Sequence, residues 1–268
     1  MAAASSNSFE LERVERLEDL REDWISLADQ TGHPFATWEW NQCWWRWFGE
    51  DRELYTYRCL NGNGDVIAIL PLYVAAVRPL RVARFLGYAD MHSPICEPST
   101  RPLVAEALRA ATRQPGGCSL LVAERLPCAE GWGDLLGGKA FERVNDPMLK
   151  FDGMSWEEFL ASRSSNFRAQ VGKRERRAIR KHGLTYRLAD DPGRLAEDME
   201  SLFRLHAARW GAETTGVFEG DRASFHQDFA AESRVLSSGP IGRAASLGLN
   251  FASTLPDPLR RRVMRITG

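Results

Sequence analysis

The side chains that could carry acid–base chemistry in this sequence are three histidines in different settings. His92 follows Asp90 in the stretch "GYADMHSP", and His206 lies on the apolar face of a predicted helix. His226 lies beside Asp228 in "SFHQDF". Imidazole titrates near neutral pH and is a common general base. Structural roles are favoured instead: His92 in a turn with a local side-chain bond, and His206 as a hydrogen-bonded core histidine. His226 and Asp228 are not spaced as a catalytic dyad. We therefore name no general base.

Other chemical motifs are missing from the sequence. It contains no glycine-rich phosphate loop, no H-E-x-x-H zinc motif and no G-x-S-x-G nucleophile motif. The cysteines are odd in number, scattered and without a C-x-x-C pair: Cys43, Cys59, Cys96, Cys118 and Cys128. We predict neither a disulfide framework nor a metal site, and reduced cysteines indicate a cytoplasmic protein. No apolar run is long enough for a membrane span, and the N-terminus shows no secretory signal.

The strongest polar feature is the stretch "SSNFRAQVGKRERRAIRKHG", residues 164–183. Nine basic residues and one acid lie between Arg163 and Arg187, although the whole chain has a formal charge of −1. Arginine and lysine neutralise phosphate and carboxylate oxygens, so this stretch could bind an anionic ligand. The candidates for that contact are Lys173, Arg176, Arg177 and Arg180.

Three other interpretations compete for the same stretch. The commonest reason for such a pattern is a solvated helix face whose narrow apolar edge, formed by Phe167, Val171, Ala178 and Ile179, docks on the domain. Binding of nucleic acid is disfavoured by the overall pI of about 6.5 and by the lack of interleaved aromatic residues. A membrane-surface helix is disfavoured because the apolar edge is narrow.

Periodicity and turn signals predict a compact α/β unit in the first part of the chain. Helices are expected over residues 10–30, over 38–48 between a Thr37 cap and a Gly49 stop, and over 101–114. The run from Asn61 to Asp65 predicts a hairpin turn, and strands are expected over 81–87 and 118–126. Along the second helix one face carries Trp40, Trp44, Trp47 and Phe48, which is typical of a core stripe rather than of a ligand site.

A second unit is expected to begin after residue 150. Ser155 and Glu158 fit a capping box, and the basic stretch is a helix with Ser165 or Asn166 as its cap and Gly183 as its stop. Further elements are a strand over 184–189, a helix capped by Asp191 that ends before Gly211, and a short helix capped by Asp221. The predicted organisation is a unit over 10–150, a second unit over 151–232 and a tail over 233–268 with little to build a core.

An ordered set of segments resembles a known family. These segments are "PFATWEWNQCWWRWFG", "VIAILPLYV", "RFLGY", "FLASRSSNFRAQVGKRERRAIRKHGLTYRLA", "LFRLHAARWG" and "FEGDRASFHQDFAAE". Together they resemble the bacterial CelD/BcsL-like acetyltransferases of the GNAT superfamily, which are related in build to the Fem-type peptidoglycan aminoacyltransferases. The resemblance covers roughly residues 10–232 in consistent order.

The resemblance implies a mixed α/β fold with two tandem GNAT-like units. It implies an acyltransferase in which the second unit uses acetyl-CoA or another acyl-CoA as co-substrate, without a metal, and the acceptor is an amine or hydroxyl of a small molecule or saccharide. A link to exopolysaccharide or cellulose production is also implied. Arg209, Trp210 and His226 lie in the stretches that carry the resemblance and are our candidates for lining the substrate side of the cleft. The alternative roles are a core anchor for Trp210 and a surface ion-pair partner for Arg209.

The sequence departs from the family after Glu232, where a hairpin, a strand and a helix of the acyl-CoA cleft are expected. Only 36 residues follow Glu232, and they end in a basic cluster. We hypothesise a frameshift or premature stop that leaves the second unit incomplete, with an inactive product as one outcome. Two other functions stay open. One is a non-catalytic module that binds an anionic polysaccharide, lipid headgroup or nucleic acid, and the other is an aminoacyl transferase that uses charged tRNA.

Overall fold

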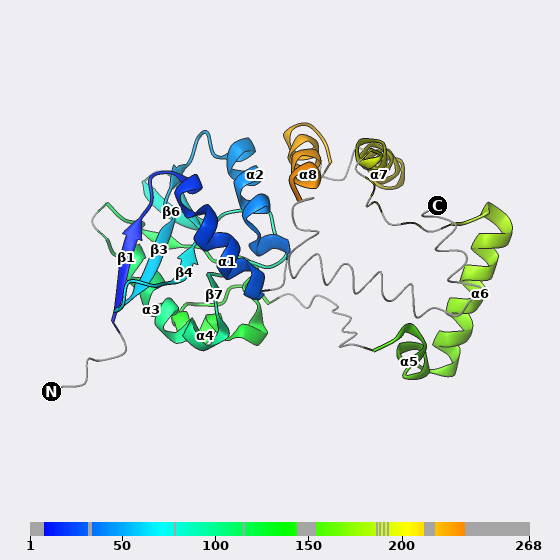
Figure 1. The fold of residues 1–268 in the computed structure, drawn as a ribbon, viewed down its shortest axis with the longest axis horizontal. Coiled ribbons are helices and arrows are strands. Elements are labelled where there is room, and N and C mark those ends of the chain that lie inside the picture. The colour runs from blue at the N-terminus through cyan, green and yellow to red at the C-terminus, as the bar shows by residue number, and fades with distance from the viewer. Residues whose placement is uncertain are drawn as a thin grey trace.

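The structure is a computed structural model that describes residues 8–31, 34–77, 79–114, 116–143, 154–185, 193–211 and 218–233, with the single residues 187, 189 and 191. The described residues form a mixed α/β structure with two small sheets. The strands among them all lie before residue 122, and helices form the part from Met154 onward (Figure 1). The predicted division near residue 150 stays a prediction, and the predicted tail lies outside the described residues beyond Ser233.

Two four-stranded sheets make up the strand layer. The first has the order β1-β3-β4-β7 and is antiparallel throughout. The second has the order β2-β5-β6-β8, in which β6 and β8 are parallel and joined through a helix. The strands are β1 (Phe9–Arg13), β2 (Glu53–Leu54), β3 (Tyr57–Asn61), β4 (Val66–Leu70), β5 (Leu72–Val77), β6 (Leu80–Phe85), β7 (Ile95–Cys96) and β8 (Leu120–Leu121).

The predicted hairpin is confirmed as β3 and β4. The side-chain oxygen of Asn61 accepts hydrogen bonds of 2.9 Å from the backbone N–H groups of Asn63 and Asp65, which closes the turn. Gly64 has φ of 85°, a backbone conformation that glycine adopts without steric cost. The run "VIAILPLYV" is nevertheless two strands, because Pro71 separates β4 from β5 and has no N–H to give to a ladder. This break is where the two sheets part.

The helix predicted over residues 10–30 is wrong in its first part. Phe9–Arg13 is strand β1, paired with β3 so that Leu11 lies opposite Cys59. A 3₁₀ turn over Leu17–Leu20 and α1 (Arg21–Thr31) then follow. The alternation of apolar and acidic residues in "FELER" is typical of a strand with one face towards the core. Its partner strand is β3.

Helices cover both faces of the strand layer, so the core has two halves. One half joins the strands to α1 and α2 (Trp38–Phe48), with Ile69 and Trp44 at its centre. The other half joins them to α3 (Arg101–Thr112) and α4 (Trp132–Leu136), with Leu70 among its buried residues. Ile69 and Leu70 are neighbours in one strand and therefore point to opposite faces. The core interpretation of the tryptophan stripe is confirmed, since Trp40 and Trp44 are buried and Trp47 and Phe48 pack against the same half.

Local signals placed both ends of α2 and the start of α3 correctly, whereas α3 ends at Thr112 instead of the predicted residue 114. The Thr37 side chain accepts from the N–H of Trp40 at the start of α2, and the N–H of Gly49 donates to the carbonyl of Trp45 at its end. Pro102 lies in the first turn of α3. The strand predicted over 118–126 is reduced to β8. The short 3₁₀ turns are Pro34–Ala36, Pro98–Thr100 and Cys128–Glu130.

The later helices are α5 (Trp156–Ala161), α6 (Ser165–His182), α7 (Leu195–Trp210) and α8 (Asp221–Glu232). The capping box at the start of α5 is confirmed, as are the glycines that end α6 and α7.

Three predicted helix starts are wrong by a few residues. Ser164 caps α6 instead of Ser165 or Asn166, and Gly220 precedes α8, whose first residue is Asp221. Asp191 accepts from the N–H of Gly193 and so closes a turn before α7. The described residues of the predicted strand 184–189 lie in no strand, and residues 186 and 188 lie outside the described residues. No helix in the described part of the chain is long and apolar enough to cross a membrane.

Candidate functional site

The candidate residues fall into two groups. Arg209 and Trp210 end α7, and His226 lies in α8, which packs between α7 and α2 (Figure 1). Lys173, Arg176, Arg177 and Arg180 lie in α6. We describe the α2–α7–α8 junction first, because the structure brings the first group together there.

Aromatic packing fixes α8 against α2. Phe225 is fully buried, and its ring meets the Trp40 ring edge-on at a centroid distance of 4.9 Å. Phe229, one turn later, approaches the same indole at 4.8 Å. Both belong to the core half that contains α1 and α2, so α8 completes that core although residues 49–220 separate it from α2 in sequence.

A polar group seals the edge of this contact. The indole N–H of Trp47 donates to Asp228 at 2.9 Å, and Arg46 donates to Glu232 at 2.7 Å. The buried Cys43 thiol donates to the same Glu232 carboxylate at 3.3 Å. Burial, together with this carboxylate, raises the pKa of Cys43 to about 12. The thiol is therefore protonated at neutral pH and is no nucleophile.

His226 lies inside the aromatic part of the junction. Its ring centroid is 4.9 Å from that of Phe225, 5.0 Å from that of Phe218 and 6.0 Å from that of Trp40. Burial lowers its pKa, so the imidazole is neutral at pH 7. No hydrogen bond to its ring nitrogens occurs within the described residues. A neutral imidazole without a protein partner keeps one nitrogen able to accept a proton or a hydrogen bond.

Phe218 connects His226 to the end of α7. The His206 ring meets Phe218 edge-on at 4.9 Å, and Trp210 lies 6.5 Å from His206. The Arg209 guanidinium stacks on the Trp210 ring at 4.9 Å. Arg209, Trp210 and His226 therefore belong to one chain of ring contacts. Sequence reasoning did not find Phe218, because a single phenylalanine between two helices gives no periodic signal.

Neither alternative role for the end of α7 is seen among the described residues. Trp210 is 51% exposed, so it anchors no core, and no residue of α7 is buried. The Arg209 contact that the structure gives is a cation–π stack rather than an ion pair. His206 is half-buried between two aromatic rings, without the hydrogen bond expected of a core histidine among the described residues. An exposed tryptophan with an arginine on its face can bind a flat or anionic group.

His92 has the expected structural role, but its contacts reach as far along the chain as Glu124 instead of forming a local side-chain bond. Its two ring nitrogens lie 3.3 Å from the carbonyl of Glu124 and 3.2 Å from that of Gly87, and its ring stacks on Phe85. Burial lowers the pKa of His92 although these carbonyls oppose the shift. The adjacent cavity has a volume of about 10 Å³ and is lined in part by Asn41 and His92. That is room for one water molecule and not for a substrate.

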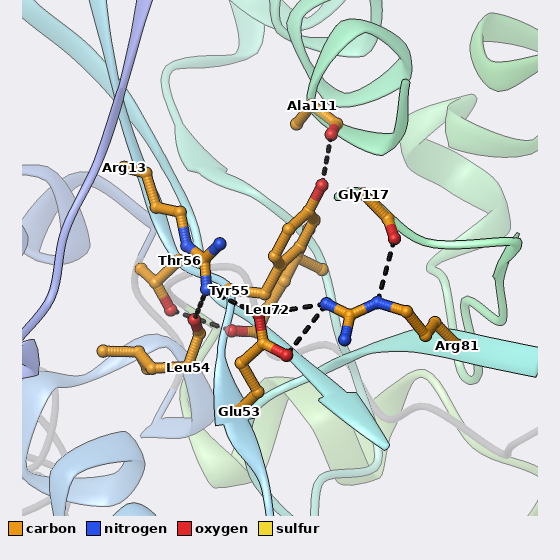
Figure 2. Close-up of polar contacts among 9 residues, drawn as sticks. All are labelled: Arg13, Glu53, Leu54, Tyr55, Thr56, Leu72, Arg81, Ala111 and Gly117. Atoms are coloured by element: carbon orange, nitrogen blue, oxygen red, sulfur yellow. Dashed lines mark hydrogen bonds and ion pairs between the residues drawn. The ribbon is translucent and has the colours of Figure 1, made fainter. Parts of the chain in front are cut away.

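Glu53 is the centre of a second polar network, which joins three strands (Figure 2). Arg13 donates to it at 2.8 Å from the end of β1, and Arg81 donates at 2.8 Å from β6. Tyr55 lies beside it and donates to the carbonyl of Ala111 in α3 at 2.6 Å, which ties the strand layer to the helix. Desolvation works to raise the pKa of Glu53, but the two arginines outweigh it and lower the pKa. Glu53, Arg13, Arg81 and Tyr55 each have a hydrogen-bond partner within the protein, so we assign this network a structural role.

The anion-binding candidates form no site with the α7–α8 residues. α6 contains no buried residue, and Lys173, Arg176, Arg177 and Arg180 all point into solvent. The described part of the chain contains no group of three or more metal-ligating side chains. Its cysteines are all free, with Cys128 exposed.

Comparison with known proteins adds no identity to this geometry: no protein family, no curated protein and no solved structure matches the chain.

Proposed function

We propose that this chain is an acyl-CoA-dependent N- or O-acyltransferase of the GNAT type, built as two tandem units. The observation that carries the proposal is the position of His226. It is a neutral imidazole held by Trp40, Phe218 and Phe225 where α8 of the second predicted unit packs on α2 of the first.

The chemistry requires a proton acceptor beside an acyl donor. The acceptor amine or hydroxyl forms a bond to the thioester carbonyl carbon, the carbon–sulfur bond breaks, and the proton lost by the acceptor ends on the CoA thiolate or on solvent. A neutral imidazole in apolar surroundings can accept that proton transiently, as a general base. Trp210 and Arg209 are exposed at the end of the same chain of ring contacts and offer a flat face and a cation to the donor or the acceptor.

An acyl-CoA cleft in the GNAT family is built from a strand as well as a helix. The family holds the diphosphate of CoA between a splayed strand and a helix N-terminus, and the residues described after Met154 include helices but no strand. Binding of the donor or the acceptor at the α7–α8 junction is therefore a separate property from turnover of acyl-CoA. The acceptor is a small molecule or a saccharide, and use of acyl-CoA places the reaction in the cytoplasm.

Calorimetric titration of the purified full chain with acetyl-CoA tests the proposal. Saturable heat that is lost in Arg209→Gln and Trp210→Ala supports it, with Arg204→Gln, an exposed arginine in the same helix, as the matched control. Absence of heat at high acetyl-CoA concentration contradicts an acyl-CoA-dependent activity for this chain. A transferase that used charged tRNA would instead show binding of RNA that falls steeply and linearly in log salt.

A further inference from the structure

One side of α6 is entirely cationic or neutral. At 3.6 residues per turn, six cations within nine residues fall inside an arc of about 160°, and the single acid of the helix, Glu175, lies on the other side. These nine residues rise by about 12 Å along the helix axis. We call this surface the basic face of α6; it consists of Lys173, Arg174, Arg176, Arg177, Arg180 and Lys181.

The basic face is open to solvent. All six of its side chains are exposed, whereas the half-covered positions of α6, such as Val171, Ala178 and Ile179, lie on the opposite side. None of the six forms an ion pair within the described residues. A solvated face of a neutral protein usually mixes both signs of charge, whereas six uncompensated cations form a surface to which a ligand of high negative charge can bind.

The charge density selects the kind of polyanion. Double-stranded DNA carries one phosphate per about 1.7 Å of axis, so about 12 Å of helix spans about seven phosphates, close to the number of cations on the face. The B-DNA major groove is wide enough to admit an α-helix. A polysaccharide with one carboxylate on every sugar or every second sugar offers fewer charges over the same length.

Other polyanionic partners fit less well. The basic face contains no aromatic residue on which the bases of a single strand could stack. The major groove of double-stranded RNA is too narrow for a helix. A membrane surface would need the apolar edge of α6, but that edge points away from the basic face, and its largest member, Phe167, packs edge-on against Phe159 at 6.4 Å.

We propose that the basic face of α6 binds the phosphate backbone of double-stranded DNA in the major groove, without reading its sequence. Phosphate contacts of this kind position a protein and carry no sequence information. Since the whole chain has a formal charge of −1 and residues 163–187 hold nine basic residues and one acid, the rest of the chain carries a net charge of −9. The net charge of the rest of the chain therefore repels DNA, whereas the basic face of α6 attracts it. The proposal does not depend on the acyltransferase activity.

Fluorescence anisotropy with a short labelled DNA duplex and the full chain measures the binding. Full engagement of the face predicts that the affinity falls about 10³-fold between about 50 and about 200 mM salt, with a slope near −5 in a plot of log affinity against log salt. The triple variant Arg176→Gln, Arg177→Gln, Arg180→Gln should reduce that slope by about 3. Its melting temperature should not change, because the three side chains are exposed.

A matched control removes the same charge elsewhere. Arg21, Arg143 and Arg204 are exposed and form no ion pair within the described residues, so the triple Gln variant at these positions should keep the wild-type slope. Equal losses in both triple variants would overturn the proposal, because binding would then follow net charge alone. No binding at low salt would overturn it as well. Tighter binding to an RNA duplex of the same sequence, to heparin or to phosphatidylglycerol vesicles at equal charge concentration would overturn the choice of DNA.

Discussion

Phe225 of α8 and Trp40 of α2 meet edge-on with their ring centroids 4.9 Å apart, and both are buried. Among the described residues after Met154, those of α8 pack into the hydrophobic core that the sheets share with α1 and α2. The Phe225–Trp40 contact lies between α8 and α2 and is part of this packing. An edge-to-face pair gains both apolar burial and the attraction between ring edge and ring face. The position of His226 depends on it, because His226 is the next residue along α8.

Phe225→Ala should release α8 from α2. Deletion of a buried phenylalanine ring costs about 3–5 kcal/mol, and here the cost falls on the docking of one helix. Hydrogen exchange should show faster exchange of the α8 amides while the β3–β4 amides stay protected. Phe167→Ala is the control, since Phe167 is 42% exposed and its loss should leave α8 unchanged. Unchanged exchange in α8 after Phe225→Ala would show that the ring contact does not hold the helix.

His226 should make the protein less stable in mild acid. Burial lowers its folded-state pKa below the unfolded value of about 6.5, so below that value the unfolded chain binds more protons than the folded chain. Stability therefore falls as the pH drops from about 6.5 towards the folded pKa, and then the loss is complete. Urea midpoints at pH 7.5 and 5 should differ less in His226→Gln than in the wild type. His182→Gln, at an exposed position of α6, should keep the wild-type difference.

Local signals in the sequence were sufficient where one turn or one cap decides the structure. The Thr37 cap, the Asn61–Asp65 turn and the Ser155–Glu158 capping box each depend on contacts within five residues. Strand β1 was missed because its pairing with β3 involves residues more than 40 positions away, and the helical spacing of Leu17, Leu20 and Trp24 continued the wrong pattern backwards.

The candidate site was predictable only in part for the same reason. His226 and Trp210 were chosen from the resemblance, yet nothing local indicated that Phe218 would bring them into one cluster. The exposure of Trp210 was not predictable from its apolar stripe, because periodicity shows which residues share a face and not what covers that face.

Gly87 should tolerate no side chain. Its φ is 94°, and a Cβ added there would lie 3.1 Å from Nε1 of Trp40. Gly87→Ala therefore combines backbone strain of about 1–2 kcal/mol with a steric contact against a buried indole. Gly64→Ala has a similar φ of 85° and open space around the added Cβ, so it measures the strain alone. Urea denaturation should show the larger loss of stability for Gly87→Ala, and equal losses would mean that the indole simply moves aside.

The cysteines should divide into reactive and protected groups. Burial raises the pKa of Cys43 to about 12 and those of Cys59 and Cys96 to about 11, whereas Cys128 is exposed. Iodoacetamide at pH 8 should therefore modify Cys128 first and leave the other three intact, because only thiolates react. Peptide mass spectrometry gives the order, and labelling in denaturant, where all should react, is the control. Modification of Cys43 as fast as Cys128 in the native protein would show that α8 opens on the labelling timescale.

Glu53→Gln should weaken the junction of β1, β2 and β6. The glutamine keeps the shape of the side chain but loses the charge that pairs with Arg13 and Arg81 at 2.8 Å each (Figure 2). Since Glu53 is 39% exposed and the pairs are screened by solvent, we expect a loss of about 1 kcal/mol at neutral pH. Glu22→Gln, at an exposed acid without an ion pair among the described residues, should cost less.

The pH dependence of this loss separates charge from packing. The folded-state pKa of Glu53 is lowered, so its contribution is present above the unfolded pKa of about 4.3 and is lost as the pH falls through the folded pKa. The wild type and Glu53→Gln should therefore differ in urea midpoint at pH 7, and the difference should shrink as the pH falls below about 4.3. A difference that does not shrink as the pH falls would mean that the glutamine disturbs the packing around Tyr55, whose hydroxyl bond to Ala111 lies beside the network.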